Sequence, residues 1–304
     1  MNIPHIPVLL EEVKEAFAGI DEGYIIDCTL GYGGHSEALL EQSLHVKLIC
    51  CDQDAEAIAF SQKRLERFSE RIIFEYGNFS SVIEKYGHLP IRGILADIGV
   101  SSLQLDKKER GFAFDSDVLD MRMNPLQELS AYEVINDYSK EALEEIFREY
   151  GEIHEYKKLA SIICEARAKE PIKSAKELSK LAEKIGGKKT IHPSTLLFQA
   201  IRIEVNNELG VLNALLESIK NANLQECRVA IISFHSLEDR IVKQTFKFWS
   251  QNCICPQEVM RCLCGNNHSM GKLLTKKPIE ASNKELKKNP RSRSAKLRVF
   301  SIKA

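Results

Sequence analysis

The first hundred residues alternate short apolar runs with stretches of helical spacing, and this alternation limits the possible folds more than any other feature. Helical spacing predicts helices at 36–42 and 55–68. The apolar runs predict strands at 24–28, 46–51, 72–76 and 93–98. Strands that alternate with helices form a parallel sheet with helices on both faces, so we expect an α/β protein.

The pattern changes after residue 105. Strand-like runs nearly disappear between 106 and 206, and the sequence there favours amphipathic helices. These helices are predicted at 141–150, 156–169, 175–185 and 194–222, the last with a break near Gly210. Strands are then predicted at 228–234 and 295–302. We therefore expect a discontinuous sheet domain, 1–105 with 207–304, and an inserted all-helical domain at 106–206.

Composition favours a cytoplasmic protein with reduced cysteines. No run approaches the roughly 20 apolar residues of a membrane span, and the N-terminus lacks the features of a signal peptide, so no membrane partner is expected. Nine cysteines, an odd number, do not suit a disulfide framework in a chain of 304 residues. Residues 271–304 hold eleven Lys or Arg and two acids, which indicates either a polyanionic partner or a solvated tail.

A glycine loop follows the first predicted strand, with Gly31, Gly33 and Gly34 after Asp27. Glycines at this place let a ligand approach the backbone. The loop fails the dinucleotide pattern, because Ser36 stands where the third glycine belongs. A carboxylate at Asp27 would repel a pyrophosphate and attract an ammonium or a sulfonium. The pattern therefore favours S-adenosylmethionine over a nicotinamide cofactor.

Acids also follow the second and fourth predicted strands. Asp52 is placed to accept hydrogen bonds from ribose hydroxyls, and Asp54 to cap the next helix. Phe79, after the third strand, flanks an adenine or belongs to the core. Asp97 ends the fourth strand, where it contacts the methionine part of the cofactor, orients the nucleophile, or serves as a loop cap.

At this point the sequence resembles the MraW family, ribosomal RNA small subunit methyltransferase H. The resemblance covers nearly the whole chain in order, and its motifs are jointly very specific. The matching segments are 5–11, the glycine loop, 97–104, 109–112, 119–123, 198–206 and 233–240. The family implies a Rossmann-like class I S-adenosylmethionine-dependent methyltransferase fold with an inserted all-helical domain.

The resemblance also implies the reaction and part of the site. The family methylates the exocyclic N4 of a cytosine in the decoding region of 16S rRNA, so the expected partner is 16S rRNA, within the small ribosomal subunit. The cofactor contacts that it implies are Gly33, Gly34, His35, Asp52, Phe79, Asp97 and Gln104. The chain departs from the family at 192–197, where a basic residue that is often present is missing.

Chemistry suggests which residues act on the base. Hydrogen-bond acceptors on the amino group would raise the electron density of N4, and Asp97 is the first candidate, helped by Ser101, Ser102 or a backbone carbonyl. Methylation at C5 needs a cysteine nucleophile, commonly after proline, and the chain has no Pro-Cys pair. His235 is a further candidate for contact with the base, although the segment around it also reads as a helix start capped by Ser236.

The target base must leave its stack before it reaches the cofactor. The inserted helical domain is expected to grip the RNA, and the alternatives are core packing for Phe112 and an ion pair with Glu204 or Glu208 for Arg202. The predicted RNA contacts are Arg110, Phe112, Arg122, Arg202 and Arg240.

Four cysteines cluster near the C-terminus, namely Cys253, Cys255, Cys262 and Cys264. Four thiolates suit zinc, with His268 as a spare ligand, but Cys-x-Cys is a less usual spacing than Cys-x2-Cys. The other interpretation is a metal-free hairpin with reduced thiols. The site prediction therefore includes no metal.

Rival functions remain on sequence grounds. One is a methyltransferase of the same fold that acts on a small molecule or a protein, and another is a non-catalytic RNA-binding assembly factor. The inserted domain and the basic segment argue against the first, and the intact acids and glycine loop against the second. The sequence leaves the oligomeric state open.

Overall fold

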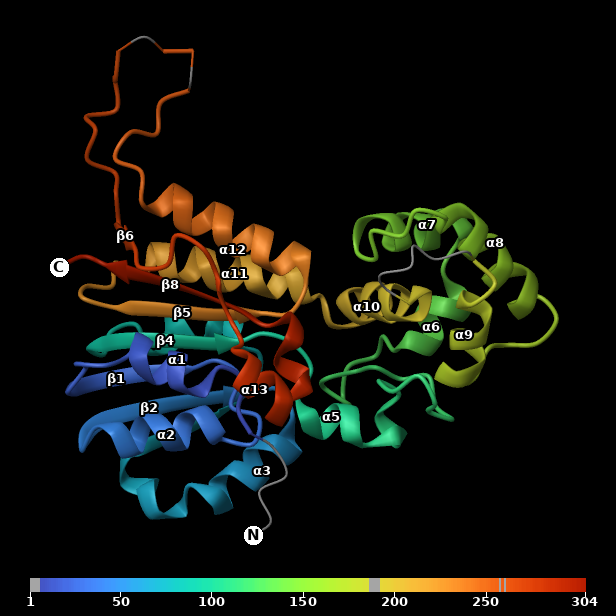
Figure 1. The fold of residues 1–304 in the computed structure, drawn as a ribbon, viewed down its shortest axis with the longest axis horizontal. Coiled ribbons are helices and arrows are strands. Elements are labelled where there is room, and N and C mark those ends of the chain that lie inside the picture. Colours follow the sequence, from blue (N-terminus) through green and yellow to red (C-terminus); the bar gives the residue numbers. More distant parts are fainter. Residues whose placement is uncertain (1–5, 186–191, 257, 260) are drawn as a thin grey trace. The chain divides into compact units, whose positions relative to one another are not determined.

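The computed structural model describes residues 6–185, 192–256, 258–259 and 261–304. His5, the first residue of the N-terminal motif, lies outside the described residues. The chain divides into two compact units, one of residues 1–99 with 211–304 and one of residues 100–210 (Figure 1). The sequence places the corresponding boundaries at 105/106 and 206/207. Among the helices of the described chain, none has both the length and the apolar character needed to span a membrane.

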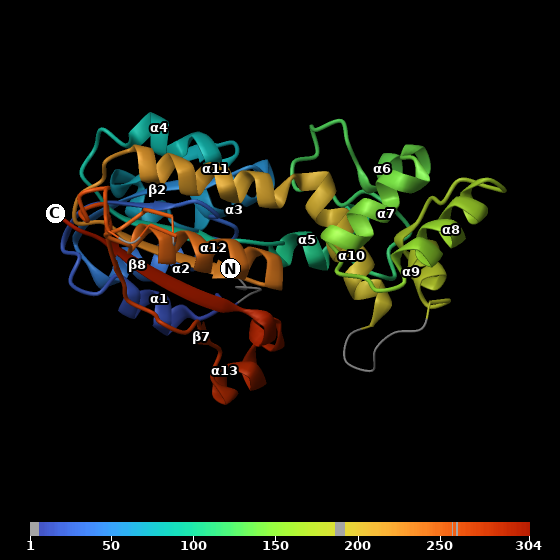
Figure 2. The same ribbon diagram turned by 90° about the horizontal axis from the view of Figure 1, so that it is seen from above.

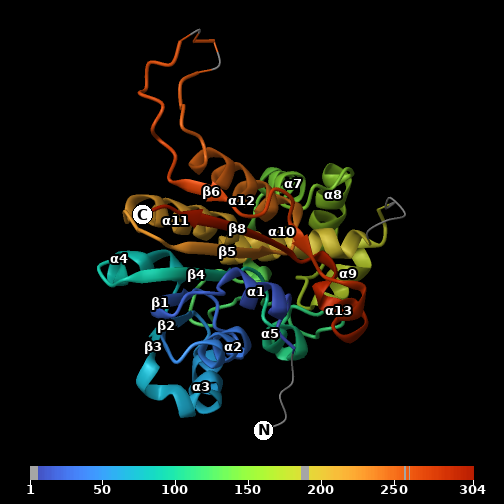
Figure 3. The same ribbon diagram turned by 60° about the vertical axis from the view of Figure 1, so that its left-hand side comes forward.

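The first unit is built on an eight-stranded sheet with the order β3-β2-β1-β4-β5-β8-β6, and β7 pairs with β8. Its strands are β1 Glu22–Asp27, β2 His45–Asp52, β3 Ile72–Tyr76, β4 Ile91–Asp97, β5 Arg228–Ser233, β6 Gly271–Leu273, β7 Ile279–Glu280 and β8 Lys296–Ile302. Strands β1 to β5 are parallel, whereas β8 is antiparallel to β5 and β6. Figure 3 shows the strands in this order from bottom to top. The α/β, Rossmann-like class predicted from the sequence is confirmed.

Helices cover both faces of the sheet, because its central strands carry apolar residues on alternate sides. In β4, Ile94 and Ala96 pack in one core with α4, α11 and α12, whereas Leu95 packs in another core with α1 and α2. Figure 2 shows α4 and α11 on one side of the sheet and α1 on the other. The helices of this unit are α1 Leu10–Ala16, α2 Gly34–Gln42, α3 Ala55–Arg64, α4 Val82–Tyr86, α12 Ser236–Trp249, α13 Asn283–Lys288 and, from residue 211 on, α11 Glu208–Asn221.

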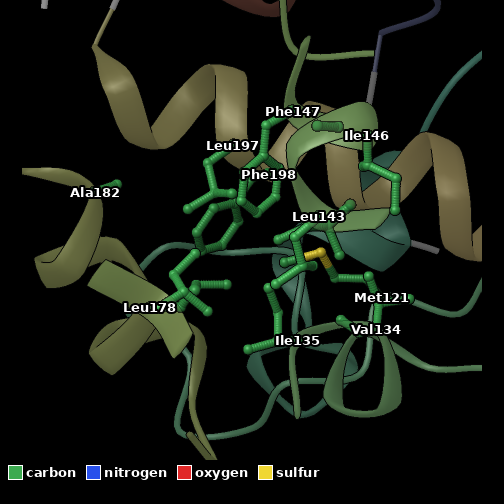
Figure 4. Packing of buried hydrophobic residues seen from close by; sticks show 14 of the residues in the cluster. Met121, Val134, Ile135, Leu143, Ile146, Phe147, Leu178, Ala182, Leu197 and Phe198 are labelled. Atoms are coloured by element: carbon green, nitrogen blue, oxygen red, sulfur yellow. The ribbon is translucent and has the colours of Figure 1, made fainter. Parts of the chain in front are cut away.

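The second unit is helical and has its own hydrophobic core. Helices α7, α8 and α9 begin and end within three residues of the predicted positions. The core includes Leu143 and Phe147 of α7 and Leu197 of α10, all with no exposed area (Figure 4). The helices of this unit are α5 Ser102–Asp106, α6 Ala131–Asp137, α7 Lys140–Glu149, α8 Tyr156–Arg167, α9 Ala175–Ala182 and α10 Pro193–Asn206.

The structure refines two expectations about the chain after residue 193. The break predicted near Gly210 lies at Asn207, whose φ is +48°, because Asn tolerates the left-handed conformation that ends α10. Of the two interpretations of the segment 271–304, the solvated tail does not hold, since the segment supplies β6, β7, α13 and β8. Arg298 of β8 is buried and pairs with Asp239 at 2.7 Å.

A buried amide joins α10 to the loop before α6. Asn206 accepts a hydrogen bond from the Met123 amide at 2.7 Å and donates to the carbonyls of Met121 and Arg202, each at 2.9 Å. Met121 has a φ of +59°, a conformation that costs a non-glycine residue free energy. The side chain of Asn206 therefore helps to hold a strained turn in place.

We predict that Asn206→Ala lowers the free energy of unfolding by about 2–3 kcal/mol, because buried backbone groups lose their partners. Denaturant unfolding followed by circular dichroism measures the change. Glu145→Ala, at an exposed position of α7, is the control and should change the free energy by less than about 0.5 kcal/mol. Equal effects of the two substitutions would contradict the role given to Asn206.

Candidate active site

The strand order places the site at the carboxyl ends of β1 and β4. The chain runs from β1 to β2 and β3 on one side, and then crosses to β4 and β5 on the other. Such a switch point leaves a crevice beyond the strand ends, where open α/β sheets bind ligands. The loops after the two strands are tied together, because the Asp97 amide donates to Thr29 Oγ1 at 2.7 Å. Sequence reasoning did not single out Thr29.

Asp27 lies under the glycine loop rather than on its surface. It is 1% exposed and accepts hydrogen bonds from the Ser36 hydroxyl at 2.6 Å and the Thr29 amide at 3.2 Å. Burial raises the pKa of Asp27, and the bond from Ser36 and the nearby His35 oppose this rise. The carboxyl thus ties the start of α2 to the loop after β1.

The three loop glycines have different reasons to be glycine. A Cβ on Gly34 would lie 2.3 Å from Pro7 Cγ, and one on Gly33 would lie 3.0 Å from Ser61 Oγ. A Cβ on Gly31 would meet nothing within 4 Å. Gly33 and Gly34 are therefore explained by internal packing, whereas Gly31 leaves open space beside the backbone.

Asp52, at the end of β2, shapes the same loop from the other side. Its Oδ2 accepts a hydrogen bond from the Gly31 amide at 2.8 Å, and its Oδ1 accepts one from the Asp54 amide at 2.9 Å. Burial raises the pKa of Asp52 to about 6, although both amide bonds lower it. Asp54 caps α3 through the Glu56 amide at 3.0 Å, as the sequence predicts.

Asp97 and His35 both carry buried polar atoms without a hydrogen bond among the described residues. Within the described part of the chain, neither nitrogen of His35 nor Oδ1 of Asp97 has a hydrogen bond, although all three atoms are buried. His35 Nε2 lies 3.6 Å from Asp97 Oδ2, which is too long for a hydrogen bond. Buried polar atoms of this kind are costly unless a ligand or water satisfies them.

Phe79 begins the 3-10 turn Phe79–Ser81 after β3 and is partly buried. It packs against the core that contains Ile83 and Ile49. The geometry thus supports the core interpretation and leaves part of the ring accessible to an adenine.

Ser101 and Gln104 form a reciprocal cap at the start of α5. The Ser101 amide donates to Gln104 Oε1 at 3.0 Å, and the Gln104 amide donates to Ser101 Oγ at 3.3 Å. This is a capping box of the Ser-x-x-Gln type. Both residues, predicted to act in catalysis and cofactor binding, thus cap a helix. The side chain of Ser102 lies outside the described atoms.

His235 stands at the N-cap of α12, so the predicted capping role of Ser236 is wrong. The fully buried Glu238 accepts hydrogen bonds from the amides of Phe234 and His235, at 2.9 and 3.3 Å. Glu238 Oε1 lies 3.1 Å from His235 Nε2 without the geometry of a hydrogen bond. Both ring nitrogens of His235 are buried and have no hydrogen bond among the described residues. Glu238 lies in the first turn of the helix, as the sequence predicts, but its place three residues after the cap is a capping-box signal that sequence reasoning did not use.

Three of the residues predicted to contact RNA have partners inside the second unit. Arg122 forms a two-point pair with Asp120, at 2.9 and 2.8 Å, and Arg202 forms one with Glu208, at 2.7 and 2.9 Å. Arg110 donates to the carbonyls of Arg122 and Met123. Phe112 is 6% exposed and belongs to the hydrophobic core of this unit. Arg240, on α12, is exposed.

Comparison with known proteins identifies the family. The model of the MraW methylase family matches residues 2–303. The chain belongs to the MraW methylase family. It is 61% identical over 99% of both chains to ribosomal RNA small subunit methyltransferase H of Aliarcobacter butzleri, and 57% identical over 100% of this chain and 99% of the other to the protein of the same name from Sulfurovum. A solved rRNA methylase from Streptococcus thermophilus aligns over 99% of both chains with 12% identity and a TM-score of 0.40, which is too low to support an argument.

The chain is therefore a methyltransferase of class I fold, and S-adenosylmethionine is its cofactor, as the loop and the acids predict. The site of this MraW methylase fits that group. Gly31 leaves open space beside the loop, and His35 offers buried ring nitrogens that lack hydrogen bonds within the described residues. Carboxylates at Asp27, Asp52 and Asp97 suit a cationic ligand and oppose a pyrophosphate.

The glycines allow a matched test. We predict that Gly34→Ala lowers the melting temperature clearly more than Gly31→Ala, because only the first substitution forces a Cβ into Pro7. Gly31→Ala should cost about 1 kcal/mol, from its φ of +50°, and should weaken binding of S-adenosylmethionine at least tenfold. Thermal unfolding and calorimetric titration measure the two effects. Unchanged binding in Gly31→Ala would show that the open space is not the cofactor's.

Proposed function

We propose that this MraW methylase transfers a methyl group from S-adenosylmethionine to the exocyclic N4 of a cytosine in the decoding region of 16S rRNA. The proposal is supported by relatives that share the chain's full length and are named ribosomal RNA small subunit methyltransferase H. The observation that carries it is the buried Oδ1 of Asp97, which has no hydrogen bond within the described chain. An amino group of a base is a donor of the kind that this oxygen lacks.

Bound S-adenosylmethionine supplies a methyl group that its sulfonium already activates. The residues of the chain must align the attacking nitrogen with that group, and alignment alone accounts for much of the rate. Cytosine N4 is a poor nucleophile because its lone pair is delocalised into the ring. Asp97 accepts a hydrogen bond from the amino group, which raises the electron density on N4 and fixes its direction.

His35 and His235 complete the proposed site. The ring of His35 lies 3.6 Å from Asp97 and limits the directions from which a ligand can reach this carboxylate. The buried Glu238 lies against the ring of His235, which follows the end of β5, the strand next to β4. We assign His235 a contact with the base. The proton that N4 carries is readily lost to solvent after transfer, so no general base is required before it.

The buried cysteines of β2 and of the loop after β1 argue against attack through carbon C5. That reaction needs a thiolate nucleophile. Burial raises the pKa of Cys28 and Cys50 well above the ordinary value and that of Cys51 to about 12. These thiols therefore stay protonated at neutral pH. Attack by the exocyclic amino nitrogen N4 needs no such group.

The proposed RNA surface differs from the one expected from motifs. Arg110, Arg122 and Arg202 serve inside the helical unit, so their contribution to RNA binding is to shape that unit. Exposed cations on the segment 271–304 are placed to contact phosphates. These cations are Lys272, Lys276, Lys277, Lys284, Lys287, Lys288, Arg291, Arg293 and Lys303.

The decisive test is transfer of labelled methyl to small ribosomal subunits that lack the modification. We expect the label in N4-methylated cytidine after nuclease digestion. Asp97→Ala should lower the rate of transfer by about 10²-fold or more, with affinity for S-adenosylmethionine changed by less than about threefold. Cofactor binding without label in the RNA would refute the ribosomal substrate.

Asp21→Ala is the matched control, since Asp21 is an exposed acid just before β1, at the opposite end of that strand. It should leave both transfer and binding unchanged. If Asp97→Ala instead weakens cofactor binding in proportion to the lost rate, Asp97 holds the methionine part of the cofactor and does not orient the base.

Asp52 makes cofactor affinity dependent on pH. Its ionised form accepts stronger hydrogen bonds from ribose hydroxyls, and its pKa is about 6. Affinity should therefore be full near pH 7.5 and fall as the pH drops through 6, by up to about tenfold at pH 5. Titration calorimetry across this range measures it. Asp52→Asn should bind more weakly at pH 7.5 and lose the dependence; a wild-type affinity that is flat between pH 5 and 7.5 argues against the ribose role.

A further inference from the structure

The segment that joins α12 to β6 projects from the sheet unit as a long hairpin (Figure 1). Its base is closed by two backbone hydrogen bonds, from His268 to Asn252 at 3.0 Å and from Met270 to Trp249 at 2.8 Å. Among its described residues from 250 to 270, none is buried. The hairpin therefore has no hydrophobic core to hold its shape.

Four thiols nevertheless converge in this hairpin. The sulfur atoms of Cys253, Cys255, Cys262 and Cys264 all lie within 4.8 Å of one another. Three of the separations are 3.5 Å for Cys253–Cys262, 3.5 Å for Cys262–Cys264 and 3.8 Å for Cys253–Cys264. A tetrahedron of sulfurs around zinc, with Zn–S bonds of about 2.3 Å, has edges of about 3.8 Å. The four thiols are thus already at the spacing of a tetrathiolate site.

Backbone amides support the sulfurs in a reciprocal pattern. The Ile254 amide, between the first two cysteines, donates to Cys264 Sγ at 3.4 Å. The Leu263 amide, between the last two, donates to Cys255 Sγ at 3.3 Å. Amides that point at sulfur stabilise thiolates, which are the form that binds a metal. The backbone amide within each Cys-x-Cys segment therefore donates to the sulfur of the second cysteine in the other segment.

We propose that these four cysteines bind one structural Zn²⁺ as thiolates. The site is closed, because four sulfurs complete the tetrahedron and leave no position for water. His268 is not a ligand, since its Nε2 lies 2.6 Å from the Cys264 carbonyl. The proposal replaces the metal-free interpretation of the sequence, and it is independent of the proposed methylation of rRNA.

The alternatives fit the hairpin less well. A disulfide requires a sulfur separation of about 2.05 Å, and it would pair the thiols two by two instead of gathering four. Four reduced thiols without a metal have no packing to hold them together, and Cys262 is exposed to oxidation. Iron also accepts four sulfurs, but methyl transfer moves no electrons, so we commit to a redox-inert ion.

The test is the metal content of the full chain, purified under reducing conditions without chelators or a metal-affinity tag. Elemental mass spectrometry should find about one zinc per chain. X-ray absorption spectroscopy should find four sulfurs at about 2.3 Å from the zinc. The double variant Cys262→Ser/Cys264→Ser should lose the zinc and keep binding of S-adenosylmethionine. Cys164→Ser, on α8 and outside the cluster, is the matched control and should keep the zinc.

A second measurement does not depend on the variant's folding. Titration of the wild-type chain with a thiol-specific mercurial should release one zinc as the four clustered thiols react. Chain that is folded, free of zinc and carries four alkylatable thiols in the hairpin would overturn the proposal. Iron in place of zinc, or disulfides among these cysteines in freshly purified protein, would overturn it as well.

Discussion

The site depends on one constraint, the contact between the ends of β1 and β4 at the place where the strand order reverses. The loops with a proposed role in binding the cofactor or the base leave the sheet at this edge. The hydrogen bond from the Asp97 amide to Thr29 fixes the two central loops to each other. Because β1 and β4 are parallel neighbours, Asp27 and Asp97 reach this edge together although seventy residues separate them in the chain. The catalytic geometry is thus a consequence of topology before it is one of side chains.

The polar residues at this edge divide into two groups. Asp27 and Asp52 accept hydrogen bonds from loop amides and a serine hydroxyl and so shape the cofactor loop, and Asp52 is also the acid proposed to contact the ribose. Asp97, His35 and His235 keep buried atoms that have no hydrogen bond among the described residues. The first group holds the scaffold, and the second supplies groups that a substrate can satisfy. This division is why substitution of Asp27 is expected to act through folding, whereas substitution of Asp97 acts on the rate.

The sequence predicts the sheet well and the partners of individual side chains poorly. Strands such as β4 and β5 appear as apolar runs, because strands that are buried on both faces must be apolar. The short strands β6 and β7 lie beyond the parallel core and have no such run, so they were missed. The packing of Gly34 on Pro7 and the pairing of Arg298 with Asp239 depend on chain segments that only the tertiary fold brings together. The spacing of Ser101 and Gln104 is that of a capping box, but these residues were predicted only to take part in catalysis and cofactor binding.

The helical unit and the hairpin after α12 differ in the interactions that can hold them in one conformation. The helical unit spans residues 100–210 and has a core that includes Phe147, Leu178 and Leu197, so packing suffices there. The hairpin after α12 is too short and too polar for a core, yet its base continues directly from Trp249, which packs on Phe246 and Phe300 in the core of the sheet unit. A rigid base with a coreless tip requires a cross-link at the tip if the hairpin is to keep one conformation. Four thiols at tetrahedral spacing meet that requirement with a metal ion, and they do so without the redox sensitivity of a disulfide.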